Sequence, residues 1–267
     1  MPRQCLYIVL LVACATISLP AQTVRPYRLD ATRDVILGAG GAAFLTAGLV
    51  LGGSIDPLSV EAINGLSRSD VPAIDRGATY NYSVTLKNAS NWLEGLLIAA
   101  PLSLFASPDV RQDAGTVAVM YLETVLLANA LAQFTKSVTT RTRPFVYNAS
   151  APMDEKQETN ARRAFFSGHA TNSFASAVFL STVYATYFPQ SPWKPVIWAA
   201  SLATAGVVAW FRVASGQHFP TDVLTGAIVG SAVGFIVPEL HRSDGAALGA
   251  SPSAMPGGYS LSLRIHF

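Results

Sequence analysis

Three short clusters of polar residues contain the side chains that could do chemistry in this chain. The residues that stand out are Lys136 and Arg143, then Ser167-Gly168-His169, then Arg212, His218 and Asp222. They supply three cations, two histidines and one carboxylate. Three cations suit a phosphate, because they neutralise the charge spread over its oxygens during phosphoryl transfer. Two histidines in opposite protonation states could attack phosphorus and protonate the leaving oxygen.

The first cluster places two cations on one predicted face. Lys136 and Arg143 are seven residues apart, so two turns of helix would point both at one anion. Pro144 then disfavours helix at Arg143. Arg141, two positions from Arg143, is expected to point elsewhere on the helix and is left out. The alternative interpretation is that these long side chains only reach from a membrane edge toward water.

The second cluster opens an apolar segment. Ser167 can cap a helix there, Gly168 lets the backbone approach a ligand, and free N–H groups at a helix start favour an anion. His169 would lie at the rim, where it can exchange a proton near neutral pH.

In the third cluster, Asp222 lies four residues after His218. It can accept a hydrogen bond from one ring nitrogen, which fixes the tautomer and makes the other nitrogen a better nucleophile. The alternative interpretation is that Asp222 caps a helix and His218 is an incidental rim histidine. Arg162 and Arg163 are expected only to attract anionic headgroups, and His241 and His266 to lie on a surface or tail.

The elements that position these clusters are apolar. Of the 267 residues, 51% are hydrophobic and only 13% charged, with a formal net charge of +2. The low net charge and the lack of a dense basic run exclude nucleic-acid binding, and the composition excludes disorder. Both cysteines, Cys5 and Cys14, lie near the N-terminus, so the body of the chain has no disulfide, thiol nucleophile or cysteine zinc site.

Six apolar stretches follow the N-terminal segment. They run approximately over 35–53, 92–106, 115–134, 170–188, 196–211 and 223–237. Three have the length of a membrane span and three need their flanks. Pro101 is expected to kink the second stretch. We therefore predict an all-α, six-helix transmembrane bundle; a soluble, mostly buried helical protein is the alternative.

The two ends of the chain are expected to lie outside this bundle. Residues 1–21 read as a signal peptide or N-terminal anchor, and Leu11-Val12-Ala13-Cys14 also resembles a lipoprotein cleavage box. Residues 259–267 alternate in hydrophobicity, which predicts a short strand or tail. The predicted domains are thus 1–21, a helical domain over 22–242, and a C-terminal tail over 243–267.

The order Lys136-x6-Arg143-Pro144, Ser167-Gly168-His169, Arg212-x5-His218-x3-Asp222 resembles the type 2 phosphatidic acid phosphatase superfamily. That group includes membrane lipid phosphatases, class A acid phosphatases and vanadium haloperoxidases. The resemblance covers about residues 35–240. Phe166 departs from it where Pro usually precedes Ser-Gly-His, and Phe211 where Ser usually precedes the Arg.

The resemblance implies a covalent, two-step hydrolysis that needs no metal and no cofactor. His218 would attack phosphorus, oriented by Asp222, and form a phosphohistidine. His169 would protonate the leaving alkoxide and then activate water. The phosphoryl oxygens would be held by Lys136, Arg143, Arg212, Ser167 and Gly168.

The expected substrates are membrane lipid phosphates, such as phosphatidic acid, phosphatidylglycerol phosphate or undecaprenyl pyrophosphate. A secreted acid phosphatase or vanadate-dependent peroxidase is the alternative within the superfamily, and a non-catalytic membrane bundle or transporter is the alternative outside it. We expect a multi-pass protein of a bacterial cell membrane with its site facing the periplasm, rather than an outer-membrane or periplasmic protein. Cleavage of 1–21 followed by six crossings would place the site in the cytoplasm, so the periplasmic prediction requires a retained leader or one stretch that does not cross. The sequence does not indicate the oligomeric state.

Overall fold

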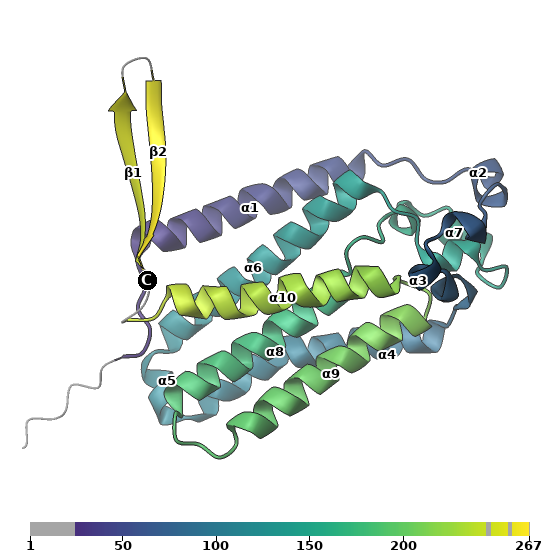
Figure 1. The fold of residues 1–267 in the computed structure, drawn as a ribbon. Coiled ribbons are helices and arrows are strands. Elements are labelled where there is room, and N and C mark those ends of the chain that lie inside the picture. Colours follow the sequence, from purple (N-terminus) through teal and green to yellow (C-terminus); the bar gives the residue numbers. More distant parts are fainter. Residues whose placement is uncertain (1–24, 244–246, 256–257, 267) are drawn as a thin grey trace, which may run out of the picture.

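The computed structural model describes residues 25–243, 247–255 and 258–266. The predicted signal segment 1–21 and its lipoprotein-like box lie outside the described residues. Within them, the bundle is built from α1 (Ala31–Gly53), α4 (Val84–Ala99), α6 (Ala114–Thr139), α8 (Gly168–Tyr187), α9 (Lys194–Ala214) and α10 (Pro220–Leu240) (Figure 1).

Short elements connect these helices. They are α2 (Val60–Asn64), η1 (Arg68–Asp70), α3 (Ala73–Arg76), η2 (Gly77–Tyr80), η3 (Ala100–Ala106), α5 (Pro108–Gln112), η4 (Pro144–Tyr147), α7 (Met153–Lys156) and η5 (Thr159–Arg162). Most of them lie in the two long connections, 54–83 and 140–167, at the same end of the bundle.

The predicted apolar stretches all fall in helical segments, which confirms the all-α core. Helix α4 begins earlier than expected, at Val84, because the Ser83 hydroxyl caps it by accepting from Leu86 N. Near Pro101, where a kink was predicted, the helix type changes, since α4 ends at Ala99 and the 3₁₀ helix η3 follows.

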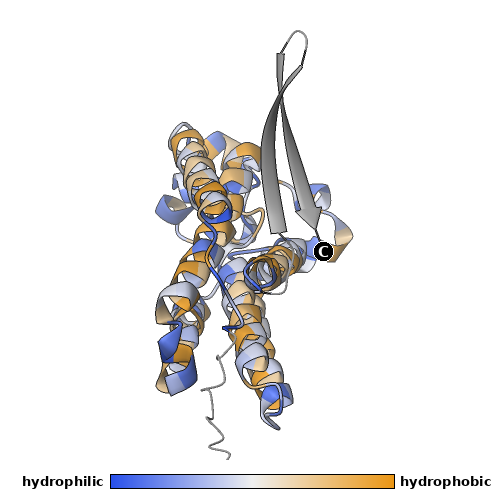
Figure 2. Cartoon of the chain, turned by 90° about the vertical axis from the view of Figure 1, so that its left-hand side faces the viewer, coloured by the Kyte–Doolittle hydropathy of each residue, from blue (hydrophilic) through white to orange (hydrophobic). Residues whose placement is uncertain are grey.

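Among the described residues, five helical segments are long and apolar enough to cross a membrane: 31–53, 84–106, 114–147, 194–214 and 220–240. Large hydrophobic side chains point outward from them, including Trp92, Leu122, Trp210 and Ile228. Figure 2 shows such hydrophobic residues in orange along the helices. An outer surface of this kind is typical of a bundle solvated by lipid rather than by water.

Helix α8 is not one of these five segments because it is rich in Ser and Thr, although it lies at the centre of the bundle, packed against α4, α6, α9 and α10. Several of its hydroxyls are hydrogen-bonded inside the protein. Ser176 Oγ lies 2.9 Å from the Tyr121 hydroxyl, and Ser181 Oγ lies 3.0 Å from Ser201 Oγ. Buried hydroxyls that bond between helices hold a membrane bundle together, which explains how a polar helix can occupy its core.

A row of glycines brings α10 directly against α8. A Cβ on Gly230 would lie 2.2 Å from Thr171 O, and one on Gly234 would lie 2.3 Å from Ala175 O. Only glycine allows this approach. At the start of the same contact, Ser167 N donates to Asp222 O at 3.1 Å. The packing of these two helices therefore fixes the second polar cluster against the third.

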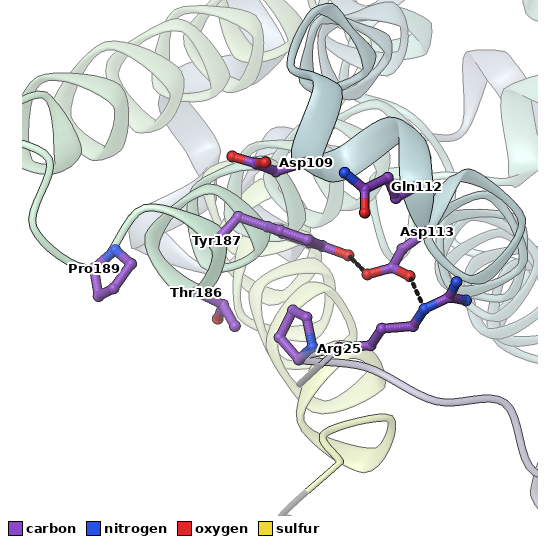
Figure 3. A pocket seen from close by; sticks show the side chains of 8 residues that line it. Arg25, Asp109, Gln112, Asp113, Thr186, Tyr187 and Pro189 are labelled. Atoms are coloured by element: carbon purple, nitrogen blue, oxygen red, sulfur yellow. Dashed lines mark hydrogen bonds and ion pairs between the residues drawn. The ribbon is translucent and has the colours of Figure 1, made fainter. Parts of the chain in front are cut away.

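The two described ends of the helical core meet at the opposite end of the bundle. Tyr27 pairs with Arg242 in an isolated bridge. Asp113, before α6, accepts from the Tyr187 hydroxyl at 3.0 Å and pairs with Arg25 Nε at 3.1 Å (Figure 3). Both ends of the described core thus lie away from the long connections 54–83 and 140–167.

The C-terminal segment forms an antiparallel hairpin of β1 (Ala247–Met255) and β2 (Gly258–His266). The strand predicted over 259–267 is β2. Its partner β1 was not predicted, because residues 247–255 lack the alternation of large apolar residues that marks a strand.

Candidate active site

A polar cavity of about 410 Å³ opens among the helix ends that contain the three clusters. Five of the predicted site residues line it: Lys136, Arg143, Gly168, His169 and Arg212. The other three, Ser167, His218 and Asp222, are completely buried. The structure therefore brings segments that are far apart in sequence to one place.

Gln217 holds the two arginines of the cavity. Its Oε1 accepts from Arg143 Nη1 at 2.9 Å and from Arg212 Nη2 at 3.4 Å. Asn160 receives two further hydrogen bonds from Arg143, and Ser90 Oγ receives one from Arg212 at 3.1 Å. Two guanidinium groups held rigidly around a polar cavity form a preorganised site for an anion. Sequence reasoning missed Gln217, although it lies inside the third cluster.

The argument that paired Lys136 with Arg143 was wrong in its geometry, although both residues line the cavity. Helix α6 ends at Thr139, and Thr140 has a left-handed backbone with φ of 43°. Arg143 is in extended backbone, and its N–H donates to Ala161 O at 2.7 Å. The two cations therefore meet because the chain turns back, and not because they share a helix face.

His218 and Asp222 face each other below the cavity. His218 Nδ1 lies 3.5 Å from Asp222 Oδ2, and neither ring nitrogen of His218 has a hydrogen-bond partner within the described structure. Asp222 Oδ2 is itself fixed, because it accepts from Phe219 N at 2.9 Å. One ring nitrogen therefore faces a carboxylate, and the other is left without a partner.

The surroundings of His218 keep its imidazole neutral. Burial lowers the pKa of His218 well below its ordinary value of 6.5, and the positive charges of Arg143, Arg212 and Lys136 lower it further. A neutral imidazole has a free lone pair, which a nucleophile or a proton acceptor requires.

Arg141 contributes to the site, contrary to the expectation that it points away. Its Nη1 donates to Asp222 Oδ1 at 2.5 Å, and its Nη2 donates to Asp75 Oδ2 at 2.7 Å. Asp75, buried in the 54–83 connection, also accepts from Thr221 N at 3.0 Å. The helix-face argument failed here because Arg141 lies beyond the end of α6. No sequence pattern indicates Asp75.

Glu94 was also missed. Its Oε2 lies 3.0 Å from His169 Nε2, and Asn91 Oδ1 lies 2.8 Å from the same nitrogen. Asn172 Nδ2 donates to the other oxygen of Glu94 at 3.1 Å. A carboxylate inside an apolar stretch is costly and is usually functional, so Glu94 in the predicted stretch 92–106 was the available signal.

The start of α8 has the predicted form. Ser167 caps the helix by accepting from Ala170 N, so its hydroxyl hydrogen remains free to donate. A Cβ on Gly168 would lie 3.0 Å from Lys136 Nζ, so the glycine leaves room for the ammonium. Phe166, in the position usually occupied by Pro, does not prevent α8 from beginning at Gly168.

The arrangement offers a buried imidazole with a carboxylate facing it, a second imidazole at the rim, and three cations that line the cavity. That combination can bind an oxyanion, attack it and supply a proton. Among the described residues, the group of carboxylates and imidazole close enough to share a metal ion lies elsewhere, at the other end of the bundle.

Part of the chain is similar to known proteins. Residues 117–245 match the family model described as the PAP2 superfamily. The chain is 35% identical over 104 residues to a lipid A 4'-phosphatase from Porphyromonas gingivalis, an alignment that covers 37% of this chain and 41% of that protein. It is 28% identical over 127 residues to a probable diacylglycerol pyrophosphate phosphatase 1 from Schizosaccharomyces pombe, covering 42% of this chain and 46% of that one. The matches thus span less than half the length of these curated relatives.

A solved structure is also similar at low identity. The crystal structure of a transmembrane PAP2-type phosphatidylglycerolphosphate phosphatase from Bacillus subtilis aligns with a TM-score of 0.39 and 19% identity. The alignment covers 74% of this chain and 93% of that one.

Proposed function

We propose that this chain, whose residues 117–245 match the PAP2 superfamily, is a membrane phosphatase that hydrolyses phosphate monoesters or pyrophosphates of lipids through a phosphohistidine. The observation that carries the proposal is the buried pair of His218 and Asp222 below a cavity lined by Lys136, Arg143 and Arg212. The family match and the phosphatases among its relatives support it.

In the first step, Nε2 of His218 forms a bond to phosphorus and the bond from phosphorus to the leaving oxygen breaks. Asp222 faces Nδ1 and stabilises the positive charge that develops on the ring. The three cations and the backbone N–H groups at the start of α8 hold the phosphoryl oxygens. His169 gives its proton to the leaving oxygen, so the lipid departs as an alcohol or, from a pyrophosphate, as a monophosphate.

In the second step, His169 accepts a proton from water as the water oxygen attacks phosphorus. The bond between phosphorus and His218 breaks, inorganic phosphate is released, and both histidines return to their starting states. Glu94, which contacts His169 Nε2, holds this imidazole in place through both steps. The scheme balances without a metal ion or cofactor.

The cavity favours a lipid whose leaving group is polar. Besides charged groups, it is lined by the carboxamides of Asn91, Asn129, Gln133, Asn160, Asn172 and Gln217. Such groups both donate and accept hydrogen bonds, which suits hydroxyls on a glycerol or sugar. The volume of about 410 Å³ suits a phosphorylated headgroup, so the acyl chains would stay in the bilayer. Within the predicted substrates, phosphatidylglycerol phosphate fits this lining better than phosphatidic acid.

The five apolar segments and the exposed hydrophobic surface favour a multi-pass membrane protein over the secreted acid phosphatase. Because the long helices alternate in direction, six crossings with α8 included would put residues 25 and 243 on the side opposite the cavity. We propose a bacterial cell membrane with the cavity facing the periplasm and both ends of the helical core facing the cytoplasm.

The experiment that tests the function is release of inorganic phosphate by protein purified in detergent. Phosphatidic acid, phosphatidylglycerol phosphate and undecaprenyl pyrophosphate would be supplied separately in mixed micelles with a chelator present. The proposal requires release from at least one of them and its loss in His218→Asn. Release that persists in this variant would contradict the assignment.

A further inference from the structure

A second cluster of titratable side chains lies at the end of the bundle opposite the cavity. Asp34 is in the first turn of α1, Glu123 is in α6, and His241 directly follows α10. His241 Nε2 lies 3.2 Å from Asp34 Oδ1 and 3.2 Å from Glu123 Oε2. His241 was expected on the surface, but it is completely buried because the returning segment around Tyr27 covers this end of α10.

The contact made by Nδ1 indicates which tautomer of His241 is present. Nδ1 lies 2.8 Å from Val237 O, and a carbonyl oxygen can only accept, so Nδ1 bears a proton. In the neutral ring, the lone pair of Nε2 therefore points toward two carboxylates. Neither Nε2 nor Glu123 Oε2, both buried, has a hydrogen-bond partner within the described structure. A lone pair and two anions repel one another, so this space calls for a proton or a metal ion.

The distances favour a metal ion. Zinc binds imidazole nitrogen and carboxylate oxygen at about 2.0–2.2 Å, so neighbouring ligand atoms in a tetrahedral site lie about 3.3 Å apart. A charge-assisted hydrogen bond from a protonated imidazole would be about 2.7–2.9 Å long. Both contacts of His241 Nε2 are 3.2 Å, and one atom from each of the three side chains lies within 4.8 Å of the others.

The surroundings supply support and access. Arg33 Nε donates to Asp34 Oδ1 at 2.9 Å, and Arg33 Nη1 donates to Leu240 O at 2.6 Å. These bonds orient the ligand carboxylate, as outer contacts commonly do in metal sites. A groove of about 390 Å³ between α1 and α6 reaches both Asp34 and Glu123. It leaves both carboxylates accessible from the surface of the bundle.

We propose that Asp34, Glu123 and His241 bind one divalent first-row transition metal ion of the zinc type. One imidazole and two carboxylates form a ligand set that such ions accept. The ion would tie the start of α1 and the end of α10 to α6. Glu123 is 13 residues from Lys136 on α6, or about 20 Å along the helix axis, so the ion takes no part in the phosphate chemistry.

The test uses the full chain in detergent, stripped of metal and then titrated with Co²⁺. Cobalt occupies zinc sites and has visible absorption bands that report its coordination. The wild type should bind one Co²⁺ per chain, with bands of four- or five-coordinate geometry, and Zn²⁺ should displace it. Glu123→Gln and His241→Gln should each weaken binding at least tenfold. The matched control is Glu239→Gln, which removes a carboxylate near the same end of α10 that pairs with Arg242 instead.

Thermal unfolding gives a second readout. Zn²⁺ should raise the Tm of the wild type and of Glu239→Gln, but not that of Glu123→Gln. Absence of cobalt bands in the wild type would overturn the proposal, as would equal binding by Glu123→Gln and His241→Gln. Should either variant fail to fold, proton NMR of the Co²⁺-bound wild type decides, because ligation by Nε2 shifts the Nδ1–H signal of His241 far outside the diamagnetic range. These readouts are independent of whether the cavity hydrolyses phosphate.

Discussion

Arg141 donates one hydrogen bond to Asp222, the carboxylate that faces the buried His218, and another to Asp75 in a distant connection. Its guanidinium also lies 4.2 Å above the Phe219 ring. Arg141 therefore fixes the third cluster of the site from behind without lining the cavity.

Removing this support should slow the reaction more than it weakens substrate binding. Arg141→Met removes the hydrogen bond to Asp222 Oδ1, so the Asp222 carboxylate is no longer fixed in place next to His218. We expect kcat to fall by about 10- to 100-fold with little change in KM, the usual effect of losing an outer contact to a site. Arg141→Lys should restore part of the loss.

The control for this prediction is Arg111→Met, which removes an exposed cation on α5 at the other end of the bundle. If Arg141→Met raised KM and left kcat intact, Arg141 would be a substrate-binding residue and the positioning role would be wrong.

Glu94→Gln tests whether Glu94 supports proton transfer by His169. The loss in kcat should be large for alkyl phosphates, whose leaving oxygen needs a proton. It should be much smaller for an aryl phosphate, because a phenolate leaves without being protonated. His169→Ala should show the same dependence on the leaving group, whereas Glu239→Gln should show none. Equal losses on both substrates would place Glu94 outside the proton-transfer step.

Burial of His218 should make the folded state sensitive to acid. The unfolded chain takes up a proton at this residue near pH 6.5, and the folded chain does so only at lower pH, because the pKa is depressed. The stability that the neutral His218 contributes is therefore fully present above pH 6.5, and it is lost as the pH falls toward the pKa of His218 in the folded chain. The loss is about 1.4 kcal/mol for each pH unit between the two values.

Unfolding by urea in mixed micelles at pH 7.5 and at pH 5.5 measures this difference. The free energy of unfolding should fall more for the wild type than for His218→Gln, which keeps the other titrating groups. Parallel losses in the two proteins would mean that His218 is not held neutral by its surroundings.

The glycine row between α8 and α10 should be required for the site. In Gly230→Ala, the new Cβ would lie 2.2 Å from Thr171 O, so the helices must separate. We expect about 1–3 kcal/mol of destabilisation and a marked loss of activity, since Asp222 and Ser167 are joined across the same contact. Gly206→Ala on α9, where nothing lies within 4 Å, should change neither property. Equal behaviour of the two variants would show that the close approach is not needed.

Much of the fold follows from hydrophobicity along the chain. The apolar stretches predict the long helices because burial and lipid exposure both select such residues. The position of α8 at the centre does not follow from hydropathy, because some of its Ser and Thr hydroxyls bond to side chains on other helices, such as Tyr121 and Ser201. Strand β1 was not predicted, because residues 247–255 do not show the alternation of large apolar residues that marks a strand.

The residues of the candidate site that cluster in sequence could be predicted. The residues that hold them in place could not be predicted. His169, Arg212 and His218 lie in short motifs whose residue types point to phosphate chemistry. Glu94 and Asp75 lie far from those motifs, and only the packing of α4 and of the 54–83 connection brings them to the site. Arg141 was excluded on the assumption that it lies on a helix. The helix α6 in fact ends at Thr139, two residues before Arg141.

The most direct test of the account is capture of the covalent intermediate. His169→Ala, given an aryl phosphate labelled at phosphorus, should still complete the first step and stall before hydrolysis, because the water lacks its proton acceptor. After rapid quenching, mass spectrometry should find an acid-labile, base-stable phosphate on the peptide that contains His218, and none in the double variant His169→Ala/His218→Asn. Absence of label under turnover conditions, or label on another residue, would contradict the central claim that His218 is the nucleophile.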